Sequence, residues 1–163
     1  MAGFKEIKKI NIEKGKEKGD AGIAKGEQRV QELQIVKEKI DQMHFQDQID
    51  EEHAQVLKES YKREGKEAYD REVKSVVESV KNDLELNKGE ISKEREKVES
   101  GIAKVGDMKG ATDLARNAAS RVEGNLKKSA DEYRQMETDT DKIKVEQEQK
   151  SRNILSRIEN MFG

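Results

Sequence analysis

The sequence predicts an all-α protein, either a long antiparallel helical hairpin or a slender coiled-coil-like bundle. Three observations support this fold class. The 163 residues include no proline, the strongest helix breaker. Charged residues make up 42% of the chain and hydrophobic residues only 32%, a balance that can cover a thin core but cannot fill a round one. Apolar residues also recur at every seventh position over long stretches, as they do in coiled coils.

The N-terminal segment of residues 1–26 is rich in Gly and Lys. Its glycines repeat at three- and four-residue spacings, at Gly15, Gly19, Gly22 and Gly26. On a helix they share one narrow face, which permits close approach of another helix. The alternative is a flexible segment, because each Gly costs a helix about 0.5–1 kcal/mol. We therefore separate residues 1–26 from a helical hairpin bundle of residues 27–163.

From Glu27 the apolar residues follow helical spacing as far as Met43, and the spacing resumes from Val56 to Tyr61. The pattern is irregular from His44 to His53, where a turn near Asp47–Asp50 fits without being required. A second periodic segment runs from Lys66 to Val105, with a length of roughly 60 Å at about 1.5 Å per residue if it is continuous. The first part of the bundle is therefore expected to be long helix.

The stretch Gly106-Asp107-Met108-Lys109-Gly110 predicts the bend of the hairpin. It lies between two long runs of helix-forming residues, and its two glycines are suited to end one helix before another starts. Thr112, shortly afterwards, is a candidate N-cap for the second helix. Gly106, Met108 and Gly110 are the residues that we assign to the bend.

Apolar side chains line one seam on each side of this bend. Polar or small residues interrupt both seams, at Asn87, Glu94 and Gly101 before the bend and at Ser129, Thr140, Gln147 and Lys150 after it. Polar core positions weaken a two-stranded coil and can set its register. We therefore expect another helix, from this chain or a partner, to complete each seam. The predicted partner-facing seam comprises Val77, Val80, Leu84, Ile91, Val98, Val105, Val122, Leu126, Met136, Ile143 and Ile154.

The residues that carry catalysis or bind metals are sparse. His44 and His53 are nine positions apart, which places them on opposite faces of a helix, and the chain has no cysteine. No glycine-rich phosphate loop is present. We therefore expect no enzymatic activity, no cofactor and no metal site. The net charge of −2 gives no reason to expect nucleic acid, and no apolar run is long enough to span a membrane.

The segment around Tyr133 and Glu137 carries a Y-x-x-x-E pattern after a glycine-containing turn. In this it resembles the WXG and LXG helical proteins of type VII secretion systems, which carry a C-terminal Y-x-x-x-D/E export signal. Met108-Lys109-Gly110 would stand in the place of the W-x-G turn. The resemblance implies a helical hairpin that pairs with another helical protein, and an export signal at Tyr133 and Glu137. The alternative is that Tyr133 is an ordinary core aromatic with Glu137 as its solvated neighbour.

The function expected from the sequence is that of a non-enzymatic helical partner protein. The resemblance implies a type VII-like secretion substrate or a targeting chaperone for a toxin, acting by helix-on-helix docking. Such a protein would be cytoplasmic before export and would be secreted without a cleaved signal peptide. One alternative is a coiled-coil adaptor or scaffold that self-associates, unrelated to secretion. Another is a small regulator that folds on its target, since the hydrophobic content is low.

Overall fold

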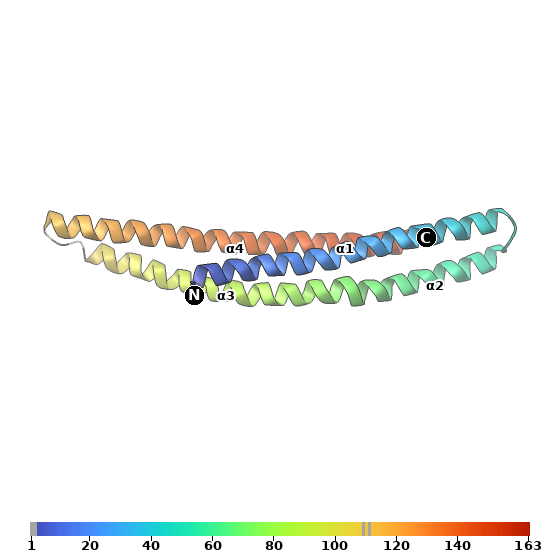
Figure 1. The fold of residues 1–163 in the computed structure, drawn as a ribbon, viewed down its shortest axis with the longest axis horizontal. Coiled ribbons are helices and arrows are strands. Elements are labelled where there is room, and N and C mark those ends of the chain that lie inside the picture. The colour runs from blue at the N-terminus through green and yellow to red at the C-terminus, as the bar shows by residue number, and fades with distance from the viewer. Residues whose placement is uncertain (1–2, 109, 111) are drawn as a thin grey trace. The chain divides into compact units, whose positions relative to one another are not determined.

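The structure is a computed structural model that describes residues 3–108, 110 and 112–163. The described residues are all-α, as predicted (Figure 1). The elements, in chain order, are α1 (Phe4–Phe45), α2 (Glu51–Tyr69), the π-helix η1 (Asp70–Lys74), α3 (Ser75–Asp107) and α4 (Asp113–Met161). Because α2, η1 and α3 follow one another without a gap, the described residues form three continuous helices. The expected boundary between residues 26 and 27 falls inside α1.

Side chains cap the N-termini of α2 and α4. Asp50 is the N-cap of α2, where its Oδ1 accepts a hydrogen bond from the backbone N–H of His53 at 2.8 Å. Thr112 caps α4 as predicted, and its Oγ1 accepts from the backbone N–H of Ala115 at 3.2 Å. The turn near Asp47–Asp50 is also present, and Asp47 adopts a positive φ of 58° there.

The helix break after α3 falls in the predicted bend. α3 ends at Asp107 and α4 begins at Asp113. Gly106 is still helical, whereas Met108 lies in the turn that follows. Lys109, which lies between Met108 and Gly110 in the expected bend, is outside the described residues.

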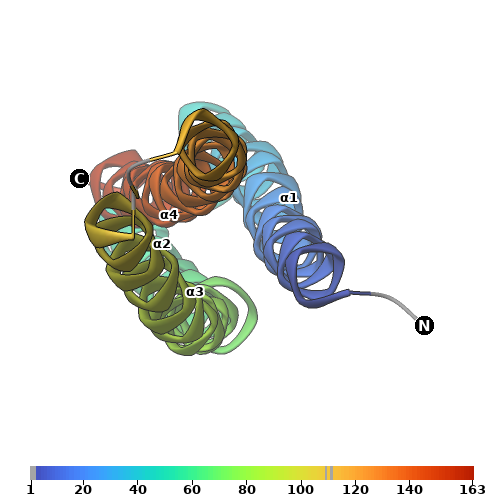
Figure 2. The same ribbon diagram turned by 90° about the vertical axis from the view of Figure 1, so that its left-hand side faces the viewer.

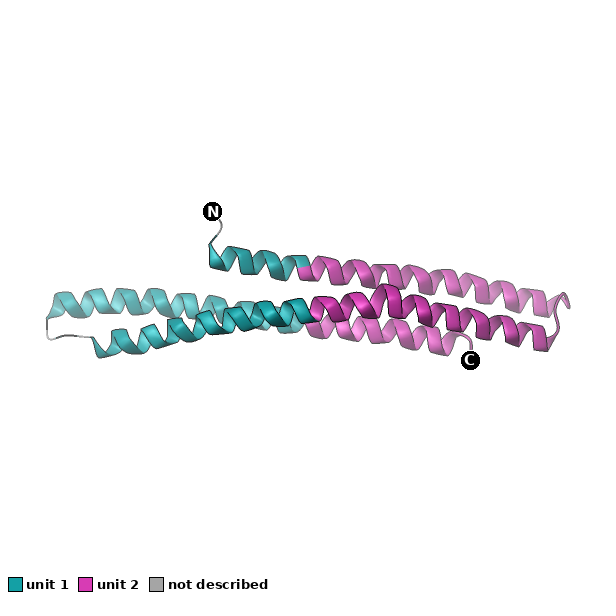
Figure 3. Ribbon diagram, turned by 90° about the horizontal axis from the view of Figure 1, so that it is seen from below, with its two compact units in different colours: residues 1–14, 82–143 teal, residues 15–81, 144–163 magenta. Residues whose placement is uncertain are grey.

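The chain divides into two compact units (Figure 3). Unit 1 consists of residues 1–14 and 82–143. In it α3 and α4 run antiparallel, since Lys88 pairs with Asp141 at 2.8 Å and Arg95 with Glu137 at 2.6 Å. The start of α1 is the third helix of this unit. The apolar core of unit 1 contains Ile12, Ile91, Tyr133 and Met136.

Unit 2 consists of residues 15–81 and 144–163. α1 runs antiparallel to the continuous helix of α2, η1 and α3, as shown by the Arg29–Glu72 pair at 3.1 Å. The last part of α4 is parallel to α1, and Gln147 Nε2 donates to the carbonyl of Lys16 at 3.2 Å. The core of unit 2 comprises Ile23, Val30, Leu33, Tyr69, Val73, Val77, Ile154, Ile158 and Phe162.

The glycines of α1 allow the helices of unit 2 to pack closely. A Cβ built on Gly22 would lie 3.0 Å from Cγ1 of Val76 and 3.4 Å from the backbone carbonyl oxygen of Glu72. A Cβ on Gly19 would collide with the side chain of Gln147. Gly19 and Gly22 therefore lie on the face of α1 that approaches the other helices of unit 2.

The π-helix η1 absorbs one extra residue in the middle of a long helix. The buried residues Gly65, Tyr69, Val73 and Val77 follow one another at three successive spacings of four residues, whereas the spacings after Val77 alternate between three and four. A π-helical turn holds one more residue than an α-helical turn, so both helices keep their apolar faces towards the same core. Val73 lies in η1 and is completely buried.

Candidate functional site

The described residues carry no arrangement of side chains suited to metal binding. They include no group of three or more His, Cys, Asp or Glu side chains that could hold an ion. His44 pairs with Glu51 at 3.1 Å. His53 contacts Asp50 at 2.6 Å, and the pKa of Asp50 is lowered, first by the hydrogen bond from the backbone N–H of His53. Each histidine therefore stabilises the turn between α1 and α2.

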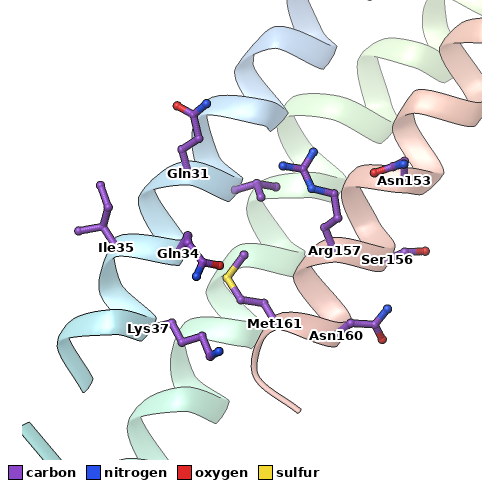
Figure 4. A pocket seen from close by; sticks show the side chains of 10 residues that line it. Gln31, Gln34, Ile35, Lys37, Asn153, Ser156, Arg157, Asn160 and Met161 are labelled. Carbon is purple, nitrogen blue, oxygen red and sulfur yellow. The ribbon is translucent and has the colours of Figure 1, made fainter. Parts of the chain in front are cut away.

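Unit 2 has an open groove of about 710 Å³ between α1 and the end of α4 (Figure 4). Its polar lining consists of amide, hydroxyl and cationic side chains: Gln31, Gln34, Lys37, Asn153, Ser156, Arg157 and Asn160. Neither a carboxylate nor a histidine is among the side chains that line it.

Tyr133 and Glu137, the candidate export signal, both make contacts inside unit 1. The Tyr133 side chain is only 5% exposed, and its ring packs edge-on against Phe4 with ring centroids 6.0 Å apart. The Nζ of Lys5 lies 5.1 Å from the centre of the same ring. Burial raises the pKa of the Tyr133 hydroxyl. The start of α1 therefore covers Tyr133, as expected of a core aromatic.

Glu137 belongs to a charged network that joins α3 to α4. Its carboxylate accepts a hydrogen bond from Arg95 Nε at 2.6 Å, and this bond raises the pKa of Arg95. Arg95 also pairs with Glu99 at 3.0 Å, and Glu99 in turn contacts Arg134. Glu137 is thus a structural ion-pair partner rather than a simply solvated neighbour.

The predicted seam separates into two groups. Six of its residues are buried by the chain's own helices: Val77, Val80, Leu84, Ile91, Met136 and Ile154. The other five are partly or largely exposed: Val98, Val105, Val122, Leu126 and Ile143. The first group is covered by the chain itself and does not face a partner in this structure. The third helix that we expected to complete the half-polar seams is α1. Four of the exposed five lie near the bend.

Unit 1 changes from three helices to two beyond the start of α1. The helices α3 and α4 run side by side to their connection, whereas α1 begins farther back (Figures 1 and 2). We call residues 93–107 and 113–129 the hairpin end. Its seam residues Val98, Val105 and Leu126 are only half-buried, and Val122 is 48% exposed. The tip of the hairpin also exposes Met108 and Leu114.

The sequence predicted only part of what the structure shows at the hairpin end. The half-polar seam indicated that a third helix was needed. The point where α1 stops covering that seam could not be read from the pattern, because a seven-residue repeat does not say which helix packs on it. Comparisons with family models, curated proteins and solved structures found no match to this chain. The hairpin end is therefore a candidate site only because of its structure.

Proposed function

We propose that this chain is a non-enzymatic helical partner protein that binds another protein by helix-on-helix docking at the hairpin end. The observation that carries this proposal is the loss of the third helix part-way along unit 1. Where α1 covers α3 and α4, Ile91, Tyr133 and Met136 are buried. Where α1 is absent, the same two seams continue with their apolar side chains partly exposed.

A third helix at the hairpin end would remove this apolar surface from water. Complete burial of a Val or Leu side chain is worth about 1.5–3 kcal/mol, so finishing the burial of several half-covered residues is a substantial driving force. The d positions Glu94 and Gly101 leave the α3–α4 contact weak by itself. An added helix would also pack closely beside Gly101, which has no side chain.

The secretion form of this proposal adds a role for Tyr133 and Glu137. In it the protein is a type VII-like substrate or a targeting chaperone for a toxin, and an export apparatus reads these two side chains. Its support is the Y-x-x-x-E pattern on a helical hairpin. Because Phe4 and Lys5 cover Tyr133, this form requires the start of α1 to move before the signal is read.

No helix among the described residues is long and apolar enough to cross a membrane.

Affinity purification of the tagged full chain from its native host tests the docking site. The test variant is Val122→Asp, which places a charge on the hairpin end. The matched control is Val145→Asp, because Val145 is also on α4 and is 53% exposed, but belongs to unit 2. We expect a bound protein that is lost with Val122→Asp and retained with Val145→Asp. Equal retention by both variants would contradict a hairpin-end site, and a stable homodimer without any other bound protein would favour the self-associating scaffold.

A further inference from the structure

The start of α1 shows how a helix docks on α3 and α4 in unit 1. Lys5 Nζ donates to Glu132 on α4 at 2.8 Å, and Lys8 pairs with Glu90 on α3. Lys9 lines a hollow together with Glu132 and Asp139. The docked segment is therefore basic, and the two rims of the groove that receives it are acidic.

The charges on the rims change beyond the start of α1. On α3, Lys97 and Lys104 lie seven and fourteen residues after Glu90, so they fall on the same side of the helix, and both are exposed. On α4, Asn125 and Ala118 lie seven and fourteen residues before Glu132, so the equivalent positions of that rim carry no acid. The α3 rim that is acidic under α1 therefore becomes basic at the hairpin end, and the α4 rim loses its carboxylates.

Further contacts agree with this placement. Lys97 and Lys104 line one hollow of α3, together with Lys93, Ser100 and Glu96. Three of these five side chains are cationic and one is acidic. Glu94 approaches Lys97 at 3.8 Å, yet the Lys97 side chain remains 76% exposed. The part of the α3 surface that carries Lys97 and Lys104 is therefore predominantly positive.

The floor between the rims is apolar and shallow. Val98 and Val105 of α3 lie along it with Val122 and Leu126 of α4, all of them partly or largely exposed. A Cβ built on Gly101 would lie 3.5 Å from Cδ1 of Leu126, so the missing side chain leaves room beside that residue. Such a floor suits the apolar stripe of a helix.

We infer that the occupant of the hairpin end is an amphipathic helix of a partner protein with Asp or Glu flanking its apolar stripe. This inference rests on the proposed function and names the chemistry of its partner. The α3 side of the site is 15 residues long, or about 22 Å at ~1.5 Å per residue, which matches roughly four helical turns. A second copy of the chain is disfavoured, because its own hairpin end mixes six acidic with eight basic residues and so offers no continuous acidic flank. Nucleic acid is disfavoured too, because the hairpin end has no aromatic side chain on which bases could stack.

Two synthetic helical peptides test the inference on the full chain. Both contain three heptads with Leu at positions a and d. One carries Glu at e and g, and the other carries Lys there. In fluorescence anisotropy titrations at low salt we expect the Glu peptide to bind at least about tenfold more tightly than the Lys peptide, because charged rims select for the opposite charge. The preference should shrink as salt is added.

Charge reversal locates the binding site. The double variant K97E/K104E should lose most of the preference for the Glu peptide, whereas the control K18E/K39E, which changes exposed lysines of unit 2, should retain it. Circular dichroism of each variant checks that helix content is unchanged. Preference for the Glu peptide that K97E/K104E leaves intact would overturn the inference.

The remaining outcomes separate the inference from the proposed function. Equal binding of the two peptides would overturn the inference but would support a helix-binding site at the hairpin end. If neither peptide binds while Val122→Asp still abolishes capture of a native protein, the inference fails and the proposed function stands. If neither peptide binds and Val122→Asp has no effect, both fail. A single-stranded oligonucleotide that binds more tightly than the Glu peptide would overturn the inference in favour of a nucleic-acid surface.

Discussion

Gly26 of α1 packs directly against Val73 of η1: a Cβ built on the glycine would lie 2.6 Å from Cγ2 of Val73 and 2.8 Å from Cδ1 of Ile154. Both neighbours are completely buried, so neither can move away freely. The contact explains why a residue with poor helix propensity stands in the middle of a 42-residue helix. The three helices of unit 2 meet at this point because Gly26 has no side chain.

Gly26→Ala should therefore destabilise the protein. Overpacking of a filled core typically costs about 1–3 kcal/mol, which exceeds the gain of up to about 1 kcal/mol from replacing Gly by Ala in a helix. The measurement is urea unfolding followed by circular dichroism at 222 nm. Gly89→Ala is the matched control, because Gly89 is also helical but has no atom within 4 Å of the added Cβ. The control should unfold at a higher urea concentration than the wild type, and an increase for Gly26→Ala as well would contradict the close packing.

Deletion of Arg71 from η1 should be tolerated. It reduces the spacing between Tyr69 and Val73 from four residues to three, so that the spacings between buried residues from Gly65 to Val77 alternate as in a regular α-helix. We expect nearly unchanged helix content and a melting temperature within a few degrees of the wild type. Deletion of the exposed Leu86 is the control, because α3 is already regular there and the deletion rotates the apolar faces on its two sides by ~100° relative to each other. Similar melting temperatures for the two deletions would show that η1 does not hold an extra residue.

Removal of the Glu72 carboxylate should change how stability depends on pH. The hydrogen bond from Arg29 lowers the pKa of Glu72 in the folded protein. A lowered pKa stabilises the fold above the unfolded value of about 4.3, and this contribution disappears as pH falls through the folded value. The difference in unfolding free energy between wild type and Glu72→Gln should therefore be present at pH 7 and vanish in acid. A Glu59→Gln control changes an exposed carboxylate. A Glu72→Gln difference that grows as pH falls would contradict the assignment.

Substitutions at Tyr133 should separate packing from signalling. Tyr133→Ala removes a buried ring, and such truncations cost about 3–5 kcal/mol, so a loss of export in this variant would reflect unfolding as well as a lost signal. Tyr133→Phe with Glu137→Gln keeps the ring and most of the volume. If an export apparatus reads these side chains, secretion of this double variant should fall while its thermal unfolding midpoint stays near that of the wild type. Undiminished secretion would leave Tyr133 as a core aromatic only.

The polar residues of the two seams were predicted partly correctly from the seven-residue repeat. Asn87, Thr140 and Gln147 were predicted at core positions, and all three are buried with hydrogen-bond partners. Lys150 was placed on the same track wrongly. It is exposed, and Ser151 is buried instead, with its Oγ 2.7 Å from the hydroxyl of Tyr69. The spacing from Gln147 to Ser151 is four residues where the repeat predicted three, so a fixed repeat misplaces the next core position.

The role of α1 could not be predicted in the same way. Many lysines and glycines separate its apolar residues. The glycines contribute to packing because they have no side chain and so let another helix come close. A pattern of apolar spacing detects buried side chains but does not detect a helix that packs through its backbone. The interruption at η1 did leave a signal, since Gly65 and Val73 are eight residues apart where a heptad places seven. Recognising it required knowledge of which of the intervening residues are buried.

Photo-crosslinking in the native host tests the central claim most directly. A photoreactive phenylalanine derivative replaces Val122 in the hairpin end of one full-length variant and Val145 in unit 2 of another. Both positions are about half exposed on the same helix, so reactivity depends on what lies next to each. We expect a discrete adduct with another protein at position 122, formed through a segment with helical spacing and flanking acidic residues, and none at position 145. The absence of an adduct at position 122, or the same adduct at both positions, would contradict the central claim.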